Sequence, residues 1–319
     1  MGLLVEGQWQ DKWYDTKNNK GQFVRQSSKF RDSISNEEDA KFQPESGRYH
    51  LYVSLACPWA HRTLIFRKLK GLESHIGVSV VHPDMLENGW KFAEFEGSTA
   101  DKLYGFDFLY QLYQKTNPEI TSRVTVPVLW DSKNQTIVNN ESAEIIRIFN
   151  QQFDCLTDNT LDFYPAALQA EIDEINNFVY HKINNGVYKA GFATSQIAYE
   201  DAVTELFKAL DVLEVRLAEN RYLLGPQITE ADWRLFTTLI RFDAVYVGHF
   251  KCNLRRIADY PNLLGYLREL YQYPGIASTV NFEHIKRHYY YSHDMINPTR
   301  VIPIGPELDL AAPHGRENL

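Results

Sequence analysis

The chain has 319 residues, 44% of them hydrophobic, and a formal net charge of −8 at pH 7. That length allows two domains that each bury a core, and the acidic balance argues against a nucleic-acid partner. No apolar run approaches the roughly eighteen residues of a membrane span, and the first residues lack the basic and apolar regions of a secretory leader. Three cysteines, at positions 57, 155 and 252, fit a reducing compartment. We therefore expect a cytoplasmic protein with no membrane partner.

Residues 1–44 are expected to form an N-terminal extension. The segment is polar as far as residue 42, and turn-forming residues interrupt any regular period. We predict an extended arm that has little secondary structure of its own and lies on the rest of the protein.

A cysteine follows the first strongly patterned segment. The alternating apolar run Tyr49–Leu55 predicts a strand over 48–55, and Pro58 with the apolar spacing after it predicts a helix over 58–70. Cys57 would then cap a helix N-terminus, where unsatisfied N–H groups and the helix dipole favour the thiolate, and His61 and Arg62 would add positive charge when oriented inward. A fall of the thiol pKa from about 8.5 to about 6 would ionise roughly nine-tenths of it at pH 7.

The residues around this thiol have the order of a thioredoxin-like domain: strand, Cys-Pro-Trp-Ala, helix and a later Val-Pro-Val strand. Position 60 is Ala, where dithiol oxidoreductases carry a second Cys. No intramolecular disulfide can therefore resolve an intermediate on Cys57, and the site needs an external thiol.

The following segments extend this domain to residue 150. A strand over 76–81 completes a βαβ unit, and an aromatic-rich insertion over 82–120 is expected to cover a site, because long structureless loops are rare in compact domains. Strands are predicted over 123–130 and 136–139, and Glu141-Ser142 opens a helix.

A turn-rich stretch over 151–162 marks a boundary, and everything after it has helical patterns. We predict helices over 165–185, 198–219, 229–246 and 259–272, a short one after Pro274, and an irregular tail from Asn297. Thr229 and Asp232 have the spacing of a capping box, which we interpret as structural.

These motifs together resemble the glutathione transferases across residues 45–285. The general features are Val126-Pro127, Glu141-Ser142, Leu223-Leu224-Gly225 and Thr229–Asp232. Four segments are more narrowly similar to the Xi class, the glutathionyl-hydroquinone reductases: Cys57–Arg62, Asn88–Trp90, Asn184–Ala193 and Arg287–Tyr290. The resemblance implies the glutathione transferase fold, with an α/β thioredoxin-like N-terminal domain over 45–152 and an all-α C-terminal domain over 163–319.

The resemblance also implies a glutathione site in the first domain. Pro127 would be cis, so that the Val126 backbone pairs with the cysteinyl amide of glutathione. Ser142 and the helix N-terminus would receive the γ-glutamyl carboxylate, and Glu141 would receive the ammonium. Two further contacts to the peptide are implied, a carboxylate fork at Arg123 and a lid over the thiol at Trp90.

Three tyrosines from different parts of the helical half are implied to line a substrate pocket facing Cys57: Tyr188, Tyr246 and Tyr289. Their phenols have an ordinary pKa of about 10 and are therefore proton donors at neutral pH. Lys189 and His288, which lie nearby in sequence, are expected to be solvated.

The implied function is the glutathione-dependent reduction of glutathionyl-hydroquinones through a Cys57–glutathione mixed disulfide, which a second glutathione resolves. Glutathione is the co-substrate, a glutathionylated aromatic compound is the substrate, and a homodimer is the expected assembly. Two alternatives share the features of the first domain. One is a broader glutathione thiol transferase that acts on protein mixed disulfides or dehydroascorbate, and the other is a non-catalytic binding protein on the same scaffold.

Overall fold

A computed structural model of the chain describes residues 2–319, so Met1, the first residue of the expected extension, lies outside it. The chain divides into two units. The first unit comprises residues 2–13, 26–161 and 279–292, and the second comprises 14–25, 162–278 and 293–319. Parts of the expected extension thus belong to both units, and residues 279–292 belong with the first. The domain limits inferred from the sequence, 45–152 and 163–319, stay a prediction.

The first unit is built on a four-stranded sheet with the order β4-β3-β6-β7. β3 (Tyr49–Val53) is parallel to β4 (Gly77–Val80) and antiparallel to β6 (Val128–Asp131), which pairs in turn with β7 (Thr136–Asn139). α1 (Pro58–Leu69) connects β3 to β4, which confirms the predicted βαβ unit. All five residues of β3 are buried, as expected for a central strand covered on both faces.

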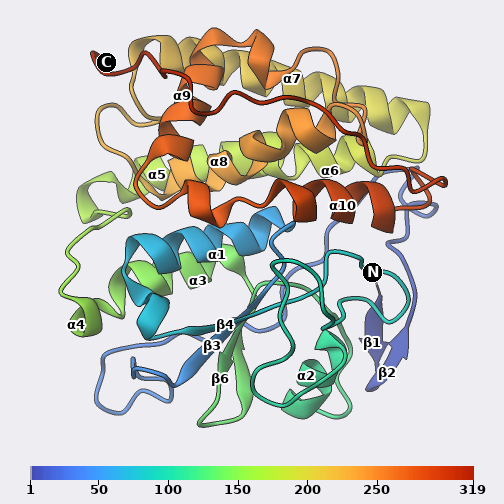
Figure 1. Cartoon of the computed structure of the whole chain (residues 1–319), viewed down its shortest axis with the longest axis vertical. Coiled ribbons are helices and arrows are strands. Elements are labelled where there is room, and N and C mark those ends of the chain that lie inside the picture. Colours follow the sequence, from blue (N-terminus) through green and yellow to red (C-terminus); the bar gives the residue numbers. More distant parts are fainter. Residues whose placement is uncertain (1) are drawn as a thin grey trace. The chain divides into compact units, whose positions relative to one another are not determined.

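Two further helices of the first unit follow the sheet. α1 packs beside α3 (Ser142–Gln151), and the short α4 (Asp154–Thr157) comes after it (Figure 1). α10 (Phe282–Ser292) also belongs to this unit, although it comes from the end of the chain. The first unit is therefore not contiguous in sequence.

The arm and the insertion contain more regular structure than the sequence predicted. β1 (Leu3–Val5) and β2 (Gln8–Gln10) form a hairpin that β5 (Ser122–Arg123) extends, and α2 (Leu109–Thr116) lies within the insertion. Glu6 and Gly7 join β1 to β2 with φ values of 47° and 72°, the left-handed pair that a tight hairpin turn requires. The expectation of little secondary structure is therefore wrong for residues 3–10, and that of an irregular insertion is wrong for 109–116.

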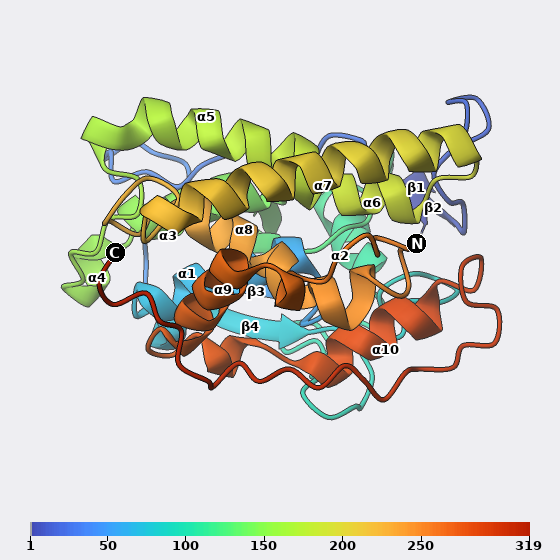
Figure 2. The same ribbon diagram turned by 90° about the horizontal axis from the view of Figure 1, so that it is seen from above.

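Every helix or strand assigned to the second unit, among the described residues, is a helix. Its helices are α5 (Gln169–Val179), α6 (Gly186–Gly191), α7 (Gln196–Glu219), α8 (Glu230–Arg241) and α9 (Pro261–Gln272). The long α7 runs beside α6 (Figure 2). Two π-helical turns, Tyr180–Asn184 and Phe242–Tyr246, continue α5 and α8, so the predicted spans 165–185 and 229–246 are confirmed as helical over most of their lengths. α6 was not predicted.

Short 3-10 turns complete the secondary structure, at Leu72–Ser74, Ala166–Leu168, Ile257–Asp259 and Ala277–Thr279. The tail from Asn297 contains no helix or strand, as expected. Within residues 2–319, no helix has both the length and the apolar character needed to cross a membrane.

The capping box at the start of α8 is confirmed. The Thr229 N–H donates to Asp232 Oδ2 at 2.8 Å, and the Tyr266 hydroxyl donates to Asp232 Oδ1 at 2.8 Å. Burial raises the pKa of this carboxyl, although the hydrogen bonds that it accepts favour the charged form. Asp232 is therefore a structural anchor of the second unit.

Candidate active site

Cys57 occupies the position predicted for it, at the N-cap of α1. Its backbone is extended, with φ −76° and ψ 122°, and Pro58 fills the first helical turn. The Sγ atom lies 3.7 Å from the carbonyl oxygen of Val126, and 9% of the residue is exposed. The thiol thus stands at a helix N-terminus, where backbone N–H groups and the helix dipole stabilise negative charge.

The two basic residues after the thiol, His61 and Arg62, have partners of their own. His61 Nε2 lies 2.7 Å from the Thr279 hydroxyl oxygen. Arg62, which is 1% exposed, places its guanidinium 4.7 Å from the centre of the Trp59 ring and donates from Nη1 to Ser142 Oγ at 3.4 Å. The charge of Arg62 therefore lies beside the N-terminus of α3.

That N-terminus carries the two residues implied to hold the γ-glutamyl group. Glu141 is the N-cap of α3, and its Oε1 accepts the Ala143 N–H at 3.2 Å. Its Oε2 accepts the Ser28 hydroxyl at 2.9 Å, which ties the arm to this helix. Ser142 is 2% exposed and contacts Arg62. A buried cation, a hydroxyl, a helix N-terminus and a carboxylate thus lie together.

The Val126–Pro127 peptide bond is cis, as expected. Val126 is 5% exposed, and its carbonyl faces the Cys57 thiol. The structure therefore brings Cys57 and the Val126 backbone together, as the predicted pairing with a peptide amide requires.

Trp90 sits on a tight turn within the insertion. Asn88 and Gly89, with φ values of 63° and 74°, form the turn that precedes it. The Trp90 indole is 4% exposed and stacks on His288, with ring centres 4.9 Å apart and planes inclined by 21°. Its buried Nε1–H has no hydrogen-bond acceptor among residues 2–319. Because an unsatisfied buried donor is costly, this N–H is a candidate for contact with a ligand.

Arg123 holds the arm in this structure. Its guanidinium donates to the backbone carbonyls of Lys12 and Trp13, the latter at 3.1 Å, and its Nε donates to Gln26 Oε1 at 3.3 Å. These contacts hold residues 12, 13 and 26, which flank the segment 14–25. The carboxylate fork implied by the resemblance stays a prediction.

The second unit brings Tyr188 and Tyr246 together. Their ring centres lie 6.3 Å apart, and Phe250 packs against both, at 5.6 Å from Tyr188 and 5.4 Å from Tyr246. Tyr246 is the last residue of the second π-helical turn, and Tyr188 lies on α6, just after the first. π-helical turns often occur at functional sites, but the sequence contained no signal that predicted them.

Tyr289 belongs to a different unit from Tyr188 and Tyr246. It lies on α10 in the first unit, the unit that contains Cys57. Tyr289 is 1% exposed, whereas Tyr290 and Tyr291 are only half-buried. His288 is also buried, at 6% exposed, so the expectation that it is solvated is wrong.

Models of two families match the chain. The N-terminal domain of glutathione S-transferases matches residues 56–152, and the C-terminal domain matches residues 196–269. A relative from Escherichia coli, the glutathionyl-hydroquinone reductase YqjG, is 60% identical over 99% of each chain. Another from Sphingobium chlorophenolicum, the glutathionyl-hydroquinone reductase PcpF, is 53% identical over 96% of each.

Solved structures agree with these matches. The glutathione-bound structure of YqjG aligns with a TM-score of 0.88, covering 91% of this chain and 96% of that one. The Xi-class transferase of Natrialba magadii aligns with a TM-score of 0.94 at 51% identity, covering 100% of this chain and 97% of that one. The chain is an Xi-class glutathione transferase.

Two arginines of this Xi-class transferase have partners that the sequence did not predict. The sequence indicated Arg62 only as a positive charge near the thiol. A buried cationic side chain requires a polar partner, and Arg62 contacts Ser142. Arg25 was not considered. Its guanidinium lies 4.8 Å from the centre of the Tyr188 ring, and its Nε donates to Asn185 Oδ1 at 3.1 Å. The polar arm of the transferase gave no signal for that contact.

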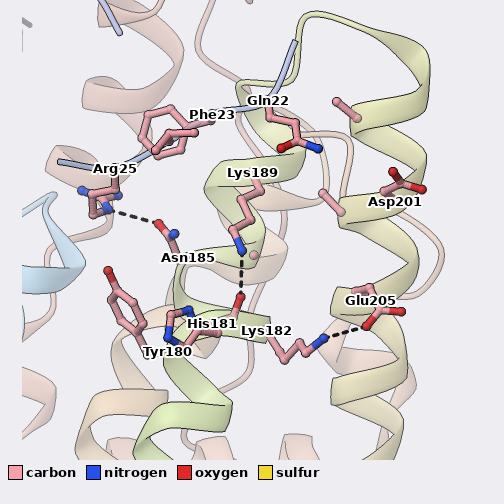
Figure 3. Close-up of a pocket in the computed structure, with 14 residues that line it drawn as sticks. Gln22, Phe23, Arg25, Tyr180, His181, Lys182, Asn185, Lys189, Asp201 and Glu205 are labelled. Carbon is pink, nitrogen blue, oxygen red and sulfur yellow. Dashed lines mark hydrogen bonds and ion pairs between the residues drawn. The ribbon is translucent and has the colours of Figure 1, made fainter. Parts of the chain in front are cut away.

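Arg25 and Asn185 also line a pocket of about 490 Å³ in the second unit of the transferase (Figure 3). Across the pocket, Lys182 pairs with Glu205 at 2.7 Å. Lys189 reaches the His181 carbonyl at 3.4 Å, so it lies against the protein and is only half exposed. None of the site residues inferred from the sequence lines this pocket.

Proposed function

We propose that this transferase reduces glutathionyl-hydroquinones to hydroquinones with glutathione as the co-substrate. The observation that carries the proposal is the placement of the Cys57 thiol at a helix N-terminus, 3.7 Å from the Val126 carbonyl. The identity of 60% to a glutathionyl-hydroquinone reductase over 99% of each chain supports it.

Cys57 is the nucleophile in this proposal. Burial raises the pKa of the Cys252 thiol, which is fully buried, and Cys155 is exposed on the four-residue α4. Of the three cysteines, Cys57 alone is at the N-cap of a helix of three turns. Its thiolate attacks the glutathione sulfur of the substrate, the bond from that sulfur to the ring carbon breaks, and a Cys57–glutathione mixed disulfide forms.

A tyrosine phenol supplies the proton that the departing ring carbon takes up. Tyr188, Tyr246 and Tyr289 are the candidates, and solvent returns the proton to the phenol. A second glutathione thiolate then attacks the mixed disulfide, which regenerates the Cys57 thiolate and releases oxidised glutathione. The ring gains a hydrogen, and two glutathione sulfurs are oxidised to one disulfide.

Glutathione is held by the first unit in this proposal. The Val126 backbone pairs with the cysteinyl amide, and Ser142 with Arg62 receives the γ-glutamyl carboxylate. Glu141 receives the ammonium, because its carboxylate can accept further hydrogen bonds besides the two that it accepts from Ser28 and Ala143. The Trp90 N–H donates to an acceptor of the peptide, and Arg123 is proposed as a contact to its far carboxylate.

We also propose a cytoplasmic homodimer. The thiols of Cys155 and Cys252 form no disulfide, which suits a reducing compartment. The mass in solution, measured by light scattering during gel filtration, tests the dimer.

The activity is tested by two assays run side by side on the same preparation. One follows menadiol release from glutathionyl-menadiol, and the other follows thiol transfer to a small mixed disulfide and to dehydroascorbate. The proposal predicts that menadiol release has the higher kcat/KM. Faster thiol transfer with little menadiol release would favour a general thiol transferase, and neither activity would favour a binding protein.

A further inference from the structure

The segment Arg287–Tyr290, which the sequence analysis singled out, has no role in the proposed function apart from Tyr289. In the structure this part of α10 contacts residues 83–96, the loop that carries Trp90. The contacts fall at both ends of that loop and at Trp90 itself.

The first contact is a bidentate ion pair. Arg287 donates from Nε to Asp84 Oδ1 at 2.7 Å and from Nη2 to Asp84 Oδ2 at 2.9 Å. Asp84 is buried, and the same guanidinium lies 5.1 Å from the centre of the Phe95 ring. A planar fork of this kind fixes direction as well as distance.

The second contact fixes the orientation of His288. Its Nδ1 lies 2.8 Å from the carbonyl oxygen of Pro83. A carbonyl can only accept, so Nδ1 carries the proton in this contact. The ring is thereby held in the plane that stacks on the Trp90 indole, at 4.9 Å.

Two more contacts extend along the same face of α10. Ser292 Oγ accepts the Met85 N–H at 3.0 Å, and His284 Nε2 lies 2.6 Å from the Glu96 carbonyl oxygen. Residues 284, 288 and 292 are spaced by four and therefore share one helix face. This face holds residues 83–85 and residue 96, on either side of Trp90.

We infer that Arg287 and His288 are positioning residues that hold the Trp90 indole so that its N–H meets bound glutathione. The inference rests on the proposed function, because Trp90 must contact glutathione. Arg287 and His288 would then contribute to the affinity for glutathione without contacting it.

Titration with reduced glutathione tests this inference, with dissociation constants measured by calorimetry. Arg287→Lys keeps the charge but loses the fork, and His288→Asn keeps a donor for Pro83 but loses the stack. Each is expected to weaken glutathione binding about tenfold. Arg48→Lys is the matched control, because Arg48 makes a bidentate pair with Asp131, at 3.0 and 2.6 Å, in the same unit. The control should leave the dissociation constant unchanged.

Trp90→Phe separates positioning from general stability. In that background the N–H to be positioned is gone, so Arg287→Lys should add less than about twofold to the dissociation constant. A full tenfold loss in the Trp90→Phe background, or a tenfold loss in the Arg48→Lys control, would overturn the inference.

The same titrations distinguish this inference from the proposed function. If Trp90→Phe binds glutathione as tightly as the parent, the contact assigned to Trp90 is wrong and the inference falls with it. If Trp90→Phe weakens binding while Arg287→Lys and His288→Asn do not, the inference fails and the glutathione site stands. Thermal unfolding of each variant identifies any that does not fold. If Arg287→Lys does not fold, His288→Asn tests the inference in its place.

Discussion

The Cys57 thiol and the Val126 carbonyl meet at 3.7 Å across 69 residues of sequence. A carbonyl can only accept, so this contact belongs to the protonated thiol. When Cys57 ionises, the carbonyl becomes available to the N–H of an incoming peptide. We therefore expect glutathione binding and thiolate formation to favour each other at this site.

Replacing Cys57 separates binding from turnover. Cys57→Ala should lower menadiol release by more than about a thousandfold, because no other thiol stands at this helix N-terminus. Cys57→Ser should also be inactive but should still bind glutathione, since the Val126 backbone and α3 are unchanged. Steady-state assays and calorimetry check the two effects. Cys155→Ser is the control and should be fully active; retained activity in either Cys57 variant would remove this thiol from the mechanism.

Tyr188→Phe tests the proton donor. Loss of the hydroxyl should lower kcat on glutathionyl-menadiol about a hundredfold, with little change in the dissociation constant for glutathione. Tyr199→Phe is the control, because the Tyr199 hydroxyl donates to the Lys251 carbonyl and has no proposed role. Equal losses in turnover and glutathione affinity would instead assign the Tyr188 hydroxyl to binding.

Gly191→Ala tests the packing behind the two tyrosines of the second unit. A Cβ at Gly191 would lie 2.1 Å from Phe250 Cγ, and Phe250 packs against Tyr188 and Tyr246. Overpacking should therefore lower the free energy of unfolding by about 3 kcal/mol.

Gly186→Ala is the matched control in the same helix. Its Cβ would meet Leu206 Cδ1 at an ordinary 3.6 Å, so the gain in helix propensity should leave stability unchanged or raise it by up to about 1 kcal/mol. Urea unfolding of both variants checks the pair. Equal free energies of unfolding for the two variants would show that Phe250 moves to accommodate the added Cβ without loss of stability.

Asp131→Asn tests a pH-dependent contribution to stability. Burial opposes the charge of Asp131, but hydrogen bonds from Arg48 and from the backbone of Asn134 and Lys133 hold its pKa below the ordinary 3.8. A carboxyl with a lowered pKa stabilises the fold above its unfolded pKa, and that stability is lost as the pH falls through the folded value. The substitution should cost about 3 kcal/mol at pH 7.

The cost should shrink as the pH falls below about 4, where the parent carboxyl also loses its charge. Urea unfolding at pH 7, 5 and 4 and at the lowest pH where the parent folds measures the difference. A cost that stays constant across this range would contradict the assigned role of the charge.

Local sequence patterns were sufficient for the parts of the fold that depend on short-range chemistry. The strand before Cys57, Pro58 at the start of α1 and the capping box of Thr229 follow from residue type and spacing. The hairpin at Glu6-Gly7 was missed because its strands have three residues each, too few to show a period.

Contacts between distant segments could not be predicted in the same way. Nothing near Tyr289 indicates that α10 packs in the unit of the sheet, and nothing near Arg25 indicates the ring of Tyr188. His288 was expected to be solvated, yet its imidazole contacts a carbonyl and an indole from one loop and is buried. These relationships depend on the fold and on no local pattern.

In the proposed mechanism, Cys57 takes glutathione from the substrate as a mixed disulfide. Mass spectrometry of the protein after exposure to glutathionyl-menadiol, with no glutathione added, tests it most directly. We expect the peptide carrying Cys57 to gain the mass of one glutathione, reversible by a reductant, while the peptide carrying Cys155 is unchanged and one menadiol is released for each protein modified. Release of menadiol with no adduct on Cys57, or an adduct on Cys155 alone, would contradict it.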